Sequence, residues 1–214
     1  MKSSLLQCYA GQTVLALGAH PDDVEMGMGG TVARLADLGA RVVVAAVCVP
    51  SLFEQRVREA RRACELLGAE FHLICNQGAL HVEDLRGYEL VARLDGLLKE
   101  LRPAALFAHG SAEVHRDHRL VFDAFQASLR IGGIDGFCYQ PCSCRPGPST
   151  FVPRAHVDIS ATLDRKMAAI AAHQSQFGAR GLDIEFVRDV ARYYGCQSGV
   201  TYAEGLDVVK LELG

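Results

Sequence analysis

The chain has 214 residues, 50% of them hydrophobic, and a formal net charge of -3, which fits one compact domain over residues 1–214. No basic surplus points to a nucleic-acid partner, and no apolar run is long enough to span a membrane. The opening segment MKSSLLQCYAGQ lacks the apolar core of a secretory signal, so we expect a soluble, cytoplasmic protein.

Apolar, β-branched runs alternate with segments of helical period in the first two thirds of the chain. The runs predict strands at residues 13–19, 41–49, 70–75 and 104–109. The helical segments are 31–39, 53–68, 87–103 and 118–130. This alternation is typical of βαβ units, so the sequence predicts an α/β fold with a mostly parallel sheet and helices on both faces.

The pattern is looser after residue 130. Short strands are predicted at 136–140 and 155–160, with a segment rich in Pro and Gly between them. Helices are predicted at 162–177 and 183–195, and residues 200–213 return to strand character. No repeat or linker divides the chain.

The chain contains eight cysteines, but its length and hydrophobic content make a disulfide framework unnecessary. Cysteines in apolar periodic segments are expected to be small buried hydrophobic residues: Cys48, Cys64 and Cys75. Three others lie close together: Cys138, Cys142 and Cys144. Their spacing matches none of the common zinc patterns, which favours a loop or protein-contact role over a metal site.

A first polar cluster follows the first predicted strand, where His20, Asp22, Asp23 and Glu25 occur within six residues. A second follows the fourth strand and contains Glu113, His115, Asp117 and His118 among others. In an open parallel sheet, ligands bind outside the carboxyl ends of the strands, so we expect the two clusters to meet at one edge.

Together the clusters offer imidazole and carboxylate groups of the kind found in catalytic zinc sites, where a fourth position is left for water. A further carboxylate could then take a proton from water, and a further histidine could stabilise the substrate. Simpler interpretations stay open: paired aspartates can cap a helix, and an H-x-x-H pair can occur by chance on a surface. The Gly-rich stretch after Glu25 could suggest a phosphate loop, but it lacks G-x-G-x-x-G.

Two motifs resemble those of a known superfamily, the PIG-L/LmbE-like N-acetylglucosaminyl deacetylases. AHPDDVEMGMGGT at 19–31 resembles the A-H-P-D-D-x-E motif, and HRDH at 115–118 resembles the H-x-D-H motif. HQSQF at 173–177 and GVTYAEGL at 199–206 also match in the expected order. The resemblance covers nearly the whole chain and is nearest in style to the bacillithiol-type enzymes that act on N-acetylglucosaminyl-malate.

The resemblance implies a Rossmann-like fold and a hydrolytic site holding one Zn²⁺ per chain, although other divalent transition metals would also suit the ligands. It implies that His20, Asp23 and His118 are the metal ligands and that Asp22 is the general base. It also implies that His115 is the electrostatic partner or general acid, that Asp117 orients His115, and that Arg56 is the substrate anchor.

Some positions depart from the family pattern. Gln77 stands where an Asp is common, Arg116 where Pro is usual, and Phe186 near where bacillithiol-type relatives have a Tyr. None of these belongs to the predicted metal triad. Substrate contacts come from such loops, so the departures leave the identity of the sugar open.

The sequence therefore predicts a zinc-dependent hydrolase that removes the N-acetyl group from an N-acetylated amino sugar or glycoside. The small-molecule substrate is the expected partner, and the family's habit of assembling implies a homo-oligomer. Two alternatives remain: an amidase acting on a larger acyl or thiol-conjugate amide, and a non-catalytic Rossmann-like module that binds a sugar or nucleotide.

Overall fold

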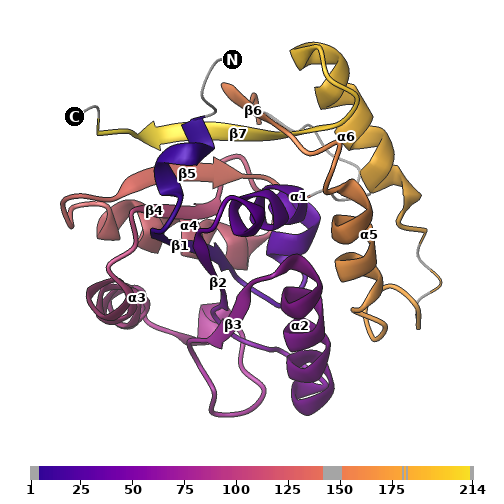
Figure 1. Ribbon diagram of the computed structural model, residues 1–214. Coiled ribbons are helices and arrows are strands. Elements are labelled where there is room, and N and C mark those ends of the chain that lie inside the picture. The colour runs from indigo at the N-terminus through magenta and orange to yellow at the C-terminus, as the bar shows by residue number, and fades with distance from the viewer. Residues whose placement is uncertain (1–4, 142–150, 180, 182, 213–214) are drawn as a thin grey trace.

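The computed structural model describes residues 5–141, 151–179, 181 and 183–212. Its centre is one seven-stranded sheet with helices packed against both faces (Figure 1). The strand order is β3-β2-β1-β4-β5-β7-β6, with neighbours parallel from β3 to β5 and antiparallel on both sides of β7. The predicted fold class is confirmed.

The elements follow the predicted order with small shifts at their ends. The strands are β1 Thr13–Gly18, β2 Arg41–Ala46, β3 Glu70–Leu73, β4 Ala105–His109, β5 Asp135–Tyr139, β6 Ala155–Asp158 and β7 Ala203–Lys210. The helices are α1 Asp23–Asp37, α2 Phe53–Leu67, α3 Gly87–Leu101, α4 Arg116–Ser128, α5 Leu163–Ala171 and α6 Glu185–Ser198. Two short 3₁₀ helices were not expected: η1 Leu5–Tyr9 and η2 Val82–Asp84.

The core consists of two apolar layers, one on each side of the sheet. Along β1, Val14 and Ala16 point into the layer formed with α1, α2, α5 and α6. Leu15 and Leu17 point into the opposite layer, formed with α3 and α4. Successive side chains of a strand alternate between its faces, and both faces are covered here, so β1 is a continuous apolar run.

Helix α1 begins at Asp23, well before the helix predicted at 31–39. Glycines at 27, 29 and 30 lower the helical propensity of its first turns, which explains the late prediction. Close packing explains why glycine is used: a Cβ on Gly27 would lie 2.2 Å from the ring of Tyr139. The Tyr139 hydroxyl donates to the Leu17 carbonyl at 2.9 Å, so the first turns of α1 lie directly against the sheet.

A kink divides α1 at Met28, where φ is -145° and ψ is 23°. The kink leaves backbone groups without helical partners, and a buried ion pair replaces them. Lys166 donates to the Met26 carbonyl at 3.0 Å and to Glu204 at 2.6 Å. The Glu204 carboxylate in turn accepts from the backbone N–H groups of Gly30 and Thr31 at 2.9 and 2.6 Å. Side chains of α5 and β7 therefore hold the shape of α1.

Other sequence expectations have mixed outcomes. The helix predicted at 162–177 ends at Ala171, and the HQSQF block that follows forms turns. The cysteines that the structure describes form no disulfide with one another, and Cys48, Cys64 and Cys75 are buried as expected. Cys142 and Cys144 lie outside the described residues, so the role expected for that trio stays a prediction. Within the described part of the chain, no helix has the length and hydropathy needed to cross a membrane.

The buried ion pair generates a stability prediction. Lys166→Met should lower the free energy of unfolding by about 3–5 kcal/mol, because Glu204 then remains charged and buried without a cation. Urea unfolding followed by circular dichroism measures the change. As a control, Arg41→Ala breaks the exposed pair with Glu70 and should cost less than about 1 kcal/mol. Similar costs for the two variants would show that the buried pair does not support α1.

Candidate active site

The loop between β1 and α1 carries an unusual backbone at Asp22. Its φ of 96° lies in the left-handed region, which costs a non-glycine residue about 1–3 kcal/mol. Asp22 occupies the N-cap position of α1, yet its side chain makes no capping hydrogen bond. The simple capping interpretation is therefore wrong for Asp22, and the strained backbone holds this carboxylate away from the helix N–H groups.

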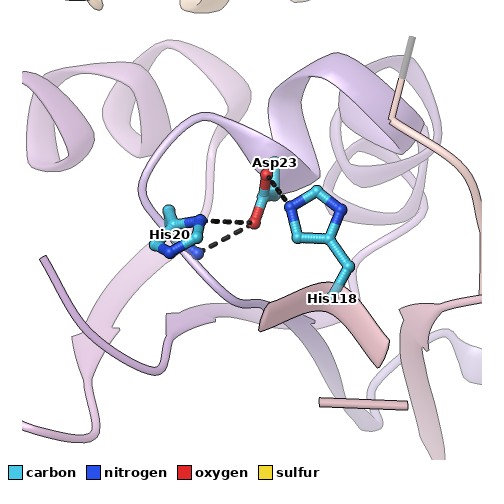
Figure 2. A group of neighbouring side chains, drawn as sticks. All are labelled: His20, Asp23 and His118. Atoms are coloured by element: carbon cyan, nitrogen blue, oxygen red, sulfur yellow. Dashed lines mark hydrogen bonds and ion pairs between the residues drawn. The ribbon is translucent and has the colours of Figure 1, made fainter. Parts of the chain in front are cut away.

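Three of the predicted site residues lie together (Figure 2). The Oδ1 atom of Asp23 is 3.2 Å from His118 Nε2, and its Oδ2 atom is 3.8 Å from His20 Nδ1. One ligand atom from each of the three residues lies within 4.8 Å of the other two. The predicted meeting of the two clusters is thus confirmed, because β1 and β4 are parallel neighbours and both segments leave the sheet at the same edge.

Each of these histidines also contacts a carboxylate through its other ring nitrogen. His20 Nε2 lies 2.9 Å from Asp117 Oδ2, and His118 Nδ1 lies 3.0 Å from Glu113 Oε2. Metal-binding histidines usually hold such an outer carboxylate, which fixes the tautomer and orients the ring. The donor set and its outer partners therefore fit a divalent metal, although the ligand roles of His20, Asp23 and His118 stay predictions.

The geometry corrects the role expected for Asp117. The resemblance implies that Asp117 orients His115, but its carboxylate contacts His20 instead. Only the backbone N–H of Asp117 reaches His115, donating to Nδ1 at 3.2 Å. The reason is that His115 is the N-cap of α4, so its ring accepts from the first turn of the helix while the Asp117 side chain points back toward the β1 loop.

The centre of the site is strongly polarised. Burial by itself raises the pKa of Asp23, but His118 and His109 outweigh it and hold that pKa well below the usual value. Burial lowers the pKa of His118, yet the carboxylates of Asp23 and Glu113 raise it to about 10. In the absence of a metal, Asp23 and His118 therefore form a charged pair, and a metal would take the place of the proton on His118 Nε2.

Asp22 behaves differently from its neighbour in sequence. Burial and the nearby charge of Asp23 raise the pKa of Asp22 to about 7, although His173 and Arg56 act in the opposite direction. Arg56 forms an ion pair with Asp22, with its Nη2 3.7 Å from Asp22 Oδ2. Adjacent carboxylates with widely separated pKa values are typical of sites in which one binds and the other transfers protons.

Arg56 is more buried than a substrate anchor would require, with 5% of its surface exposed. Its Nη2 donates to the Pro21 carbonyl at 3.0 Å, so the guanidinium supports the loop that carries Asp22. This contact gives Arg56 a structural role beside the base. The substrate-anchoring role implied by the resemblance stays a prediction.

His115 completes the set, with its ring centroid 5.4 Å from that of His20. Because Nδ1 accepts a hydrogen bond from the Asp117 N–H, the neutral ring carries its proton on Nε2. Burial, His118 and His20 lower the pKa of His115, which favours the neutral form. The ring can therefore donate a hydrogen bond from Nε2 to a neighbouring group.

Two buried histidines have contacts that sequence reasoning did not assign. His109 accepts from the Ala19 N–H at 3.0 Å, and its ring stacks on that of His118 with centroids 4.0 Å apart. His173 contacts Glu25 at 3.2 Å behind the β1 loop. The sequence could have indicated His109, because it lies at the end of β4, where ligands of a parallel sheet bind. It could not have indicated His173, which lies in a turn where the sequence predicts a helix.

Comparisons with known proteins agree with this architecture. The diacetylchitobiose deacetylase of Thermococcus kodakarensis is 29% identical, and the match covers 92% of this chain and 82% of that enzyme. A conserved protein of Thermus thermophilus has a solved structure that is 28% identical, with a TM-score of 0.78 over 95% of this chain and 97% of that one. The N,N'-diacetylchitobiose deacetylase of Pyrococcus horikoshii is 25% identical, with a TM-score of 0.71 over 92% and 84% of the two chains.

A family model also matches the chain directly, and it is described as PIG-L, GlcNAc-PI de-N-acetylase. The match runs from residue 15 to residue 129 and so spans both polar clusters, as well as most of β1 and all of β4 and α4. With more than half of its length matched and the fold shared with the solved structures, this chain belongs to the PIG-L family.

Proposed function

We propose that the protein is a metal-dependent hydrolase that removes the N-acetyl group from an N-acetylated amino sugar or glycoside, releasing acetate and a free amine. The observation that carries this proposal is the position of Asp22. Asp22 is the chain neighbour of Asp23, which belongs to a cluster of two imidazoles and one carboxylate suited to a metal, and its own carboxylate makes no capping bond and senses the charge of Asp23. Similarity to two diacetylchitobiose deacetylases supports the N-acetyl sugar as substrate class.

The metal would be held by His20 Nδ1, the Asp23 carboxylate and His118 Nε2. Zn²⁺ suits this set of two nitrogen ligands and one oxygen ligand, and iron, cobalt or nickel could replace it. When bound, such an ion polarises a carbonyl group and lowers the pKa of water. Asp117 and Glu113 orient the two imidazoles from behind, which keeps the ligand nitrogens pointing at the same place.

Asp22 acts as the general base in this proposal. Its carboxylate takes a proton from the attacking water and returns that proton to the departing amine nitrogen. A pKa of about 7 suits both steps, because the group then accepts and releases a proton with little driving force lost. The strained backbone at Asp22 keeps the carboxylate out of the N-cap bonds that would otherwise compete for it.

His115 stabilises the negative charge that develops on the carbonyl oxygen. Its Nε2–H is the available donor because Nδ1 is already engaged by the Asp117 N–H. A donor held in this way before reaction needs no reorganisation when the charge appears. The neutral ring favoured by the lowered pKa makes His115 a hydrogen-bond donor in preference to a general acid.

A screen of N-acetylated amino sugars tests the substrate class. Zinc-loaded protein should release free amine from at least one N-acetylglucosamine-type compound, chelation should abolish the release, and added zinc should restore it. Amine release is measured by derivatisation with a fluorogenic reagent. Turnover restricted to larger acyl or thiol-conjugate amides would contradict the acetyl assignment, and hydrolysis that resists chelation would contradict metal dependence.

Asp22→Asn tests the base. The variant should lose about 10²- to 10⁴-fold in kcat, because the amide cannot accept the proton from water. Its zinc content, measured by elemental analysis, should stay close to that of the parent, because Asp22 is not among the proposed ligands. Asp123→Asn, on the exposed face of α4, is the matched control and should keep full activity. Undiminished kcat in Asp22→Asn would remove this residue from the base role.

Glu113→Gln tests the outer support of His118. The variant removes the negative charge that contacts His118 Nδ1. This loss should weaken the affinity for zinc by about 10- to 100-fold. Competition with a chromophoric chelator measures this affinity without reference to turnover. Glu65→Gln changes an exposed carboxylate on α2 and should leave the affinity unaltered. Equal affinities in Glu113→Gln and the parent protein would show that His118 needs no carboxylate behind it.

A further inference from the structure

The ring of His20 lies between two groups of side chains. Its Nδ1 faces Asp23, the side drawn in Figure 2. Its Nε2 lies 2.9 Å from Asp117 Oδ2. A ring nitrogen of His20, the Cys48 Sγ and an Asp117 carboxylate oxygen all lie within 4.8 Å of one another. The reaction proposed above uses the first side of the ring and leaves the thiol on the second side without a role.

Strand pairing explains why Cys48 lies there. The register pairs Gly18 with Ala46, and the parallel bonding continues past both strands. The N–H groups of Val47 and Cys48 donate to the carbonyls of Gly18 and Ala19 at 3.0 and 3.1 Å. Continued by two residues, this register sets Cys48 opposite His20. The Cys48 side chain is fully buried, and its Sγ lies 3.7 Å from the Ala19 carbonyl.

We propose that His20 Nε2, the Cys48 thiolate and the Asp117 carboxylate form a second metal site, selective for thiophilic divalent cations such as Cd²⁺ or Zn²⁺ in excess. One nitrogen, one oxygen and one sulfur ligand around a single point is a set that such ions accept. The sulfur distinguishes this set from the first one, whose ligands are two imidazoles and a carboxylate. Soft cations should therefore prefer the second side of the ring.

Occupation of this site exchanges protons for metal and involves no redox step. The cation forms bonds to nitrogen, oxygen and sulfur, the proton of the Cys48 thiol passes to solvent, and the neutral His20 ring changes tautomer, so that its proton leaves Nε2 and Nδ1 takes one up from solvent. The Nε2–H bond to Asp117 is lost at the same time. Resting on the function proposed above, we infer that this cation inhibits, because the proton then held on Nδ1 blocks the nitrogen that would hold the catalytic metal.

Cadmium binding gives a readout that is independent of turnover. When wild-type protein is titrated with Cd²⁺, its thiolate-to-cadmium absorption band should be more intense than that of Cys48→Ser. The difference in absorbance should correspond to one cadmium-bound thiolate per chain. Serine nearly conserves the volume but is a poor ligand for a soft ion. Cys64→Ser is the matched control, because Cys64 is equally buried yet belongs to no metal-binding group among the described residues. Its band should keep the Cys48 contribution.

An Asp23→Asn background separates this proposal from the first. That change removes a ligand of the catalytic metal but none of the second set, so the Cys48-dependent band should persist. Inhibition by cadmium is compared between wild type and Cys48→Ser, both with Asp23 in place, as the activity with cadmium divided by the activity without it. The cadmium concentration that lowers this ratio should be at least about 10-fold lower for wild type. Identical cadmium bands in wild type and Cys48→Ser would overturn the second site, whatever the outcome of the activity screen.

Discussion

The carboxylate of Asp23 is the interaction on which the site depends. One oxygen meets His118, and the other accepts from the His20 N–H at 2.8 Å and lies 3.2 Å from His109. The loop after β1, the end of β4 and the first turn of α4 are thus joined at a single side chain. Without that negative charge, Glu113 would be the carboxylate that still contacts His118, and the electrostatic link between these elements would be lost.

The environment gives the two adjacent aspartates opposite properties. Asp23 points into the histidines and stays ionised, whereas Asp22 lies against Arg56 and the buried side of the loop, where its charged form is less favoured. The left-handed backbone at Asp22 allows two adjacent carboxylates to lie in such different surroundings. Local strain, which lowers stability, is therefore compensated by the packing of α1 against Tyr139 and by the buried Lys166–Glu204 pair.

The sequence predicted most of the architecture because strands buried on both faces are unambiguous apolar runs. The convergence of His20 and His118 followed from the rule for parallel sheets. The start of α1 was not predicted, because glycine has a low helical propensity and the close packing that requires Gly27 cannot be read from the sequence. The partner of Asp117 was also missed, since the direction of a side chain near a helix N-cap depends on tertiary contacts. Cys48 is buried as expected, but its position beside His20 depends on the strand register, which one sequence does not reveal.

The remote support of α1 also bears on how the protein is made. A nascent chain that has left the ribosome as far as residue 129 contains both polar clusters, but it lacks Lys166 and Glu204, which complete the kink in α1. In such a chain the backbone groups at the kink of α1 lack these side-chain partners, and the helix that follows the His20 loop is not yet supported. The scaffold around the candidate site is therefore complete only after β7 has been synthesised.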